Sequence, residues 1–148
     1  MTSSATALVE RLCDATNAHD LDALVECFAE SYRNETPAHP ARGFTGREQV
    51  RSNWQQIFAA VPDLTAVVHR SIAEGDEIWS EWEMHGTRPD HSLHLMRGVI
   101  IFGVVDGRAD WARFYLEPVD SATDNATVAV RTIVGAVTPV ADGAKDDS

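Results

Sequence analysis

The middle of the chain contains long apolar runs separated by short glycine turns, and this pattern restricts the fold more than any other feature. The turns are E-G-D-E at 74–77 and V-D-G-R at 105–108, and the runs are rich in Val, Ile, Trp, Phe and Tyr. Tight glycine turns between alternating apolar segments are the strongest local signal of β-hairpins. The sequence therefore predicts an antiparallel meander with strands over 64–73, 77–87, 93–105 and 109–119.

Two helices are expected before this meander. Apolar residues recur at helical spacing over 8–15. Asp20 follows as the N-cap of a second short helix, whose apolar residues are Leu21, Leu24, Val25 and Phe28. The segment 32–43 contains two prolines and little periodicity, so a short strand followed by a loop is expected there.

A third helix is expected to begin at a capping box. Thr45 is followed three residues later by Glu48, the spacing at which both side chains cap the first turn. One apolar stripe follows, made of Val50, Trp54, Ile57 and Phe58, and Pro62 ends the helix. Helices followed by a meander predict an α+β fold, in which the curved sheet buries one face against those helices.

Composition and length narrow the organisation and the partners. The 148 residues carry a net charge of −11, which argues against nucleic acid or an anionic membrane as partner. No run of about 18 apolar residues and no signal peptide is visible, so secretion and membrane insertion are not expected. Residues 1–120 are expected to form one domain, followed by a weakly helical extension over 121–137 and a disordered tail over 138–148.

The two cysteines and the histidines give no metal-binding pattern. Cys13 and Cys27 lie in helical segments without a histidine at ligand spacing, which favours two reduced thiols and a cytoplasmic location. No pair of histidines has a carboxylate at ligand spacing on one helix, so no metal site is expected.

With the elements in this order, several short motifs resemble those of one superfamily. They are G-R-E-Q-V at 46–50, V-P-D-L at 61–64, E-G-D-E-I at 74–78, W-E-M-H-G-T at 82–87 and V-D-G-R at 105–108. Together they are similar to the SnoaL-like branch of the nuclear transport factor 2-like superfamily, over about residues 5–120. That superfamily includes ketosteroid isomerases, polyketide cyclases and limonene epoxide hydrolases. The resemblance implies a cone-shaped, cystatin-like α+β fold with a curved antiparallel sheet, and this fold hosts many unrelated functions.

The resemblance also implies candidate catalytic residues. Tyr32 and Asn34 match the Tyr and Asn that hold the attacking water in limonene epoxide hydrolases. In the same frame, Trp82, Met84 and Phe114 replace the polar triad of that family, so its acid–base route is not available. Thr36 precedes Pro37 where ketosteroid isomerases carry their catalytic Asp. Glu117 falls close to the catalytic Asp of polyketide cyclases, and its alternative role is that of a solvated or capping carboxylate.

Residues alternate between the two faces of a strand, and this alternation leaves two arrangements open. If the apolar faces point inward, the cavity is expected to be lined by Trp54, Phe58, Trp82, Met84, Met96 and Phe114. If a bulge shifts the register by one residue, Glu83 and Arg113 enter the cavity and restore an acid–base pair. Otherwise Glu83 or Arg113 is expected on the outer face, through which members of this superfamily commonly form homodimers.

Two functional hypotheses follow. The first is an enzyme that needs no cofactor and acts on a hydrophobic polyketide, terpenoid or steroid-like molecule by isomerisation, cyclisation or epoxide opening. Its candidate catalytic residues are Tyr32, Asn34, Glu117, Glu83 and Arg113. The second is a non-catalytic module for small-molecule binding or dimerisation. A carboxylate inside the cavity would favour the enzyme, because an apolar surround raises its pKa into a useful range.

Overall fold

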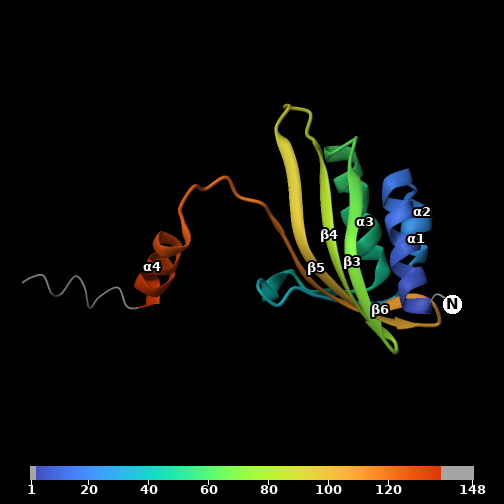
Figure 1. The fold of residues 1–148 in the computed structure, drawn as a ribbon. Coiled ribbons are helices and arrows are strands. Elements are labelled where there is room, and N and C mark those ends of the chain that lie inside the picture. The colour runs from blue at the N-terminus through green and yellow to red at the C-terminus, as the bar shows by residue number, and fades with distance from the viewer. Residues whose placement is uncertain (1–2, 138–148) are drawn as a thin grey trace, which may run out of the picture.

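A six-stranded, strongly curved sheet carries helices on one face in the computed structural model, which describes residues 3–137 (Figure 1). The strands are β1 (Phe28–Glu35), β2 (Phe44–Thr45), β3 (Thr65–Glu74), β4 (Glu77–Thr87), β5 (Leu93–Val105) and β6 (Arg108–Pro118). They are arranged in the order β2-β1-β6-β5-β4-β3. The α+β fold class expected from the sequence is confirmed.

The four long strands β3 to β6 pair in sequence as an antiparallel meander. The turns between them contain residues with positive φ, namely Gly75 at 60°, Asp106 at 52° and Gly107 at 76°. These are the left-handed conformations that tight hairpin turns require. The expected strands therefore form within one residue of their predicted ends.

Strand β1 changes the expected topology. It pairs in parallel with β6, the last strand, and antiparallel with the two-residue strand β2. The sheet is consequently mixed rather than wholly antiparallel. Phe28 begins β1, so its assignment to the second helix was wrong. That helix ends at Glu26, and Phe28 is instead buried in the sheet core.

The first two helices, α1 (Ser4–Ala18) and α2 (Leu21–Glu26), form as the pattern predicts. Asp20 caps α2, because its carboxylate accepts a 3.0 Å hydrogen bond from the Ala23 amide. The α1 helix packs against β3, β4 and β5 and buries its apolar side there. Together the helices close one face of the curved sheet (Figure 1).

The third helix, α3 (Arg47–Ala60), does not begin with the expected capping box. Its N-cap is Gly46, which adopts a φ of 94° and supplies no side-chain cap, and Thr45 belongs to β2. The Gly46 amide instead donates a 2.7 Å hydrogen bond to the Tyr32 carbonyl in β1. Thr45 does not cap the helix because it pairs with β1 as part of β2. Ahead of β2, a 3-10 turn η1 (Pro40–Arg42) follows the proline-rich loop.

The core lies between the helices and the concave face of the sheet. Its largest fully buried side chains are Trp82, Tyr32, Phe102, Leu8, Leu24, Ile78 and Ile100. Within it, the Ser80 hydroxyl donates to the Ile100 carbonyl over 2.7 Å and accepts from the Trp82 indole over 2.8 Å. The two buried polar groups thereby satisfy each other inside an otherwise apolar layer.

The helix α4 (Ala126–Val137) follows β6 after an extended segment and lies apart from the sheet (Figure 1). The tail over 138–148, for which disorder is predicted, lies outside the described residues. No helix in the described part of the chain is long and apolar enough to cross a membrane.

Candidate ligand cavity

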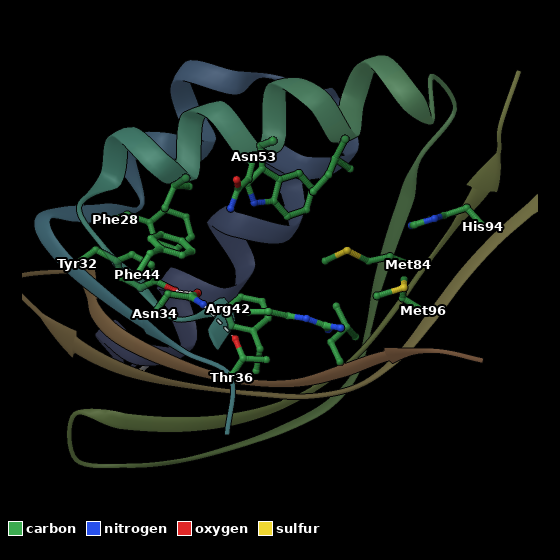
Figure 2. A pocket seen from close by; sticks show the side chains of 15 residues that line it. Phe28, Tyr32, Asn34, Thr36, Arg42, Phe44, Asn53, Met84, His94 and Met96 are labelled. Atoms are coloured by element: carbon green, nitrogen blue, oxygen red, sulfur yellow. Dashed lines mark hydrogen bonds between the residues drawn. The ribbon is translucent and has the colours of Figure 1, made fainter. Parts of the chain in front are cut away.

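A cavity of about 290 Å³ lies between α3 and the concave face of the sheet (Figure 2). Its fifteen lining residues are Phe28, Tyr32, Asn34, Thr36, Arg42, Phe44, Val50, Asn53, Trp54, Ile57, Met84, His94, Met96, Phe114 and Leu116. This volume is at the lower end of the ~300–1,000 Å³ typical of small-molecule sites. Most of the lining is aromatic or aliphatic, so the cavity suits a compact apolar body.

Side-chain alternation along the strands decides which residues line the cavity. On β4, Met84 faces inward, and on β6 Phe114 and Leu116 do the same. In register, Met84 lies opposite Met96 of β5, which also lines the cavity. The apolar faces therefore point inward. The register shifts of the sheet lie in β1, in β3 opposite Trp82 and Glu81, and at the end of β5, whereas the pairing of β4 with β5 is continuous over the whole of β4.

Three polar side chains on one face of β1 and its extension form a hydrogen-bonded row at one end of the cavity. The Tyr32 hydroxyl donates to Oδ1 of Asn34 over 2.7 Å, and Nδ2 of Asn34 donates to Oγ1 of Thr36 over 3.5 Å (Figure 2). Burial raises the pKa of Tyr32, so its hydroxyl keeps its proton at neutral pH. The row is thus fixed in direction, with Tyr32 as the first donor.

Two further polar side chains are each engaged through their acceptor atom. Oδ1 of Asn53 accepts a 2.8 Å hydrogen bond from Gln49, and Figure 2 shows the amide nitrogen turned toward the cavity. Nδ1 of His94 lies 3.3 Å from the Arg88 guanidinium, which can only donate. Burial, with a smaller contribution from Arg88, lowers the pKa of His94 and favours its neutral form. The remaining ring proton of His94 is then on Nε2.

Arg42 is the one arginine of the lining. Its side chain extends along the cavity toward the strands that carry Met84 and Met96 (Figure 2). Arg42 is the last residue of the turn η1. The loop before that turn contacts β6 through the side chain of His39. Nε2 of His39 lies 3.2 Å from Oε1 of Glu117 and 3.1 Å from Oε2.

The predicted site residues fall into two groups. Tyr32, Asn34, Trp54, Met84, Met96 and Phe114 line the cavity. Phe58 and Trp82 do not. Phe58 lies behind the lining, where it contacts the rings of His19 and Trp54, and Trp82 is buried in the core beside Ser80.

The three charged candidates lie away from the cavity lining. Glu83 on the outer face of the sheet is within 3.0 Å of His69 and 3.4 Å of Arg97, and the His69 hydrogen bond lowers the pKa of its carboxyl. Arg113 pairs with Glu35 over 2.8 Å on the same face. Glu117 is engaged with His39. The structure therefore does not bring Glu83, Arg113 and Glu117 together with Tyr32 and Asn34.

Several lining residues were not identified from the sequence. Asn53 belongs to the same helical stripe as Val50, Trp54 and Ile57, so the spacing of α3 contained the signal that places it in the cavity. His94 shares a strand face with Met96, and alternation alone could have found it. Arg42 lies in an irregular turn, where no periodicity exists to indicate its direction.

The chemistry available in the cavity follows from these side chains. Among the residues that the structure describes, no Asp or Glu lines the cavity. Nor do three or more His, Cys, Asp or Glu side chains of residues 3–137 form a group suited to a metal ion. Both cysteines are free, and burial raises the pKa of each thiol. The cavity is equipped for hydrogen bonding and apolar contact.

Comparison with solved structures finds the same fold in several proteins. RV0760c from Mycobacterium tuberculosis, solved in complex with estradiol-17beta-hemisuccinate, has 22% identity and a TM-score of 0.68, covering 77% of this chain and 94% of that chain. An epoxide hydrolase from M. tuberculosis similar to limonene epoxide hydrolases has 20% identity and a TM-score of 0.68, covering 93% and 98%. A computationally designed 17-OHP binder has 23% identity and a TM-score of 0.67, covering 77% and 93%.

Sequence comparisons give one positive and one negative result. No curated protein gives a significant match. The model of the SnoaL-like domain matches residues 9–112, which is most of the chain and spans the structure from α1 to β6. The chain therefore belongs to the SnoaL-like domain family.

Proposed function

We propose that this protein binds a compact, largely apolar small molecule in the cavity between α3 and the sheet. The lining supports this proposal, because aromatic and thioether side chains such as Trp54, Phe114 and Met96 offer adaptable apolar contacts. Two proteins of the same fold also have steroid ligands. RV0760c was solved in complex with estradiol-17beta-hemisuccinate, and another was designed as a 17-OHP binder. Those likenesses concern the fold, and the ligand of this protein is proposed from its own cavity.

The observation that favours binding over conversion is the lack of a proton acceptor in the described lining. No carboxylate faces the cavity, and Nδ1 of neutral His94 is engaged by Arg88. Tyr32 keeps its proton, and the guanidinium of Arg42 has no acceptor atom. General base catalysis needs an unprotonated group within hydrogen-bond reach of the substrate proton. A binding role without proton abstraction therefore agrees best with this set of side chains.

Proposals for an enzyme rest on a different observation, the Tyr32–Asn34 pair inside the cavity. This pair is positioned to hold a polar atom of a substrate or a water molecule. An isomerase, cyclase or epoxide hydrolase built on it would rely on Tyr32 as acid, with Glu117, Glu83 and Arg113 outside the cavity. Turnover of an identified ligand that is lost in Tyr32→Phe would establish this second candidate. A ligand recovered unchanged after long incubation would exclude it.

The binding proposal is tested with two adjacent residues of β6. Phe114 lines the cavity, whereas Tyr115 points to the outer face and is exposed. We expect Phe114→Ala to weaken binding of apolar ring compounds about tenfold, because an aromatic contact is lost, and Tyr115→Ala to leave it unchanged. Titration followed by Trp fluorescence or calorimetry measures both. Equal affinities in the two variants would refute the cavity as the binding site.

A homodimer through the outer face of the sheet is the second part of the proposal. That face exposes Ile72, Trp79 and Tyr115, with relative exposures of 75%, 54% and 42%. Charged side chains surround them, including the Arg113–Glu35 pair. An apolar centre with a polar rim is the usual anatomy of a protein interface. Analytical ultracentrifugation of Trp79→Glu should show a monomer if this face pairs two copies, and an unchanged mass would place the interface elsewhere.

A further inference from the structure

Hydrogen-bond donors dominate the polar side chains of the cavity. Three of the acceptor atoms in these side chains already receive a hydrogen bond from a neighbouring side chain. Oδ1 of Asn34 accepts from Tyr32, and Oδ1 of Asn53 accepts from Gln49. Nδ1 of His94 accepts from Arg88. The amide N–H groups of Asn34 and Asn53 and the Nε2–H of His94 are the donors that these bonds leave for a ligand.

The Thr36 hydroxyl adds another donor at the same end. Its oxygen accepts from Nδ2 of Asn34 over 3.5 Å, so its own proton is available to a neighbour. Asn34, Thr36 and the start of the Arg42 side chain lie at the same end of the cavity, and Arg42 extends from there along it (Figure 2). The polar side chains of this cavity therefore offer a ligand hydrogen-bond donors, and the rest of the lining offers apolar contacts.

Arg42 provides the only permanent charge of the described lining. The other arginines of the domain are engaged through their side chains, in ion pairs or in hydrogen bonds to carbonyl groups. Within residues 3–137, only the side chains of Arg42 and of Arg131 in α4 have no such partner. The protein has 23 acidic and 12 basic residues, so an arginine without a carboxylate partner stands out against this composition.

We infer that the cavity selects an amphipathic ligand with a compact apolar ring body and a carboxylate head group, and that Arg42 binds this carboxylate. The guanidinium offers paired N–H donors whose geometry matches a carboxylate, and such charge-assisted bonds are stronger than neutral ones. Thr36 and Asn34 lie near the start of the Arg42 side chain and add further donors to this end of the cavity. Arg42 is thus a specificity-determining residue of the proposed binding site.

This inference rests on the proposed binding function and adds the charge of the ligand to it. The overall charge of −11 repels an anion at long range. A preference for an acid over its neutral analogue must therefore arise locally, from the donors of the cavity. It must also weaken as salt screens the partly exposed guanidinium.

Matched pairs of acids and primary amides on one, two and three aromatic rings test the inference: phenylacetate, 1-naphthylacetate and 9-anthroate, each with its amide. An acid and its amide have nearly the same shape and differ in charge. In calorimetric titrations at low ionic strength we expect the best-fitting acid to bind about tenfold more tightly than its amide. Arg42→Gln should abolish this difference by weakening the acid alone, and Arg42→Lys should retain part of it.

The control is Arg131→Gln, which removes the same charge from α4 and should leave the acid preference unchanged. Equal binding of acid and amide by the wild type would overturn the inference while the proposed binding function stands. An acid preference that persists in Arg42→Gln would also overturn the inference. If no compound of the panel binds to the wild type, the proposed binding of compact apolar rings itself fails. Circular dichroism and thermal unfolding verify that Arg42→Gln, an exposed position in η1, is folded.

Discussion

The Tyr32 hydroxyl donates a 2.7 Å hydrogen bond to Oδ1 of Asn34, two residues further along β1. Residues two apart on a strand point to the same face, so the backbone itself brings the pair together. The bond also fixes the Asn34 amide, with its oxygen toward Tyr32 and its nitrogen toward Thr36 and the cavity. The orientation of one amide thereby determines whether this end of the cavity offers donors or acceptors.

Removal of the Tyr32 hydroxyl should destabilise the fold and alter ligand preference together. Tyr32→Phe leaves Oδ1 of Asn34 partly buried without its partner, so we expect a loss of about 1–2 kcal/mol in the free energy of unfolding. The Asn34 amide also becomes able to turn over and offer its oxygen to a ligand. The acid preference of the cavity should then decrease. Urea unfolding and the acid–amide titration measure the two effects, with the exposed Tyr115→Phe as control, and unchanged stability would contradict the role of the bond.

Ser80 is expected to be among the most sensitive small residues of the sheet. Its hydroxyl is buried and bridges the Trp82 indole and the Ile100 carbonyl. Ser80→Ala leaves the indole N–H without an acceptor in the core, at a cost of about 2 kcal/mol. Denaturant unfolding should show this loss, whereas Ser71→Ala, at the exposed position opposite Ser80 in β3, should be nearly neutral. Similar stabilities for the two variants would show that another group satisfies Trp82.

Asp63 gives a pH-dependent contribution to stability. Its carboxylate accepts a 2.7 Å hydrogen bond from the Thr87 amide, which holds the pKa of that carboxyl below its ordinary value of 3.8. A group whose pKa is lower in the folded state stabilises the fold above its unfolded pKa. That contribution disappears as the pH falls through the folded pKa. Asp63 thus favours the folded state at neutral pH and ceases to do so in acid.

Asp63→Asn tests this contribution, because the amide oxygen can still accept from Thr87 but has no charge to lose. We expect the variant to melt at a lower temperature than the wild type at pH 6. The difference should shrink steadily below pH 4, the range in which the wild-type carboxyl takes up its proton. A difference that stays constant down to pH 2 would assign the effect to packing rather than ionisation. Asp76→Asn, in the β3–β4 turn, serves as a control for the general effect of removing one negative charge.

The contact between His39 and Glu117 should influence the cavity through Arg42. It joins the loop before η1 to the end of β6. Loss of either side chain should let this loop move and weaken acid binding two- to threefold, with little effect on the neutral amide. Because the two residues act through one contact, the double variant should be no weaker than either single variant. Additive losses in the double-mutant cycle would mean that the two side chains act independently.

Much of the sheet could be predicted from local signals, because hairpin turns and strand alternation are encoded within a few residues. The strands Glu77–Thr87 and Leu93–Val105 form with the ends expected from the sequence. The inward position of Met84 and Phe114 follows from alternation alone once one face is buried. Helix α2 begins where Asp20 indicated. These elements depend on neighbouring residues, and the sequence contains the information directly.

The errors concern contacts between distant segments. Phe28 continues the spacing of α2, but pairing with β6 draws it into β1. Thr45 and Glu48 have the spacing of a capping box, yet Thr45 pairs with Arg33 in the sheet. Arg42 lies in the cavity because a loop folds back toward the sheet, and no periodicity indicates such a path. The position of Glu117 beside His39 depends on the same loop.

The parallel pairing of β1 with β6 sets an order for folding during synthesis. Strand β1 leaves the ribosome early, but it lies between β2 and the last strand of the sheet. Its longer neighbour, β6, is the last strand to be translated, at about 5–20 residues per second. Until then β1, with Tyr32 and Asn34, and the loop with Arg42 lack the strand with which β1 pairs. The ligand cavity is consequently among the last parts of the domain to form, and a ligand can stabilise only a chain that has been completed through β6.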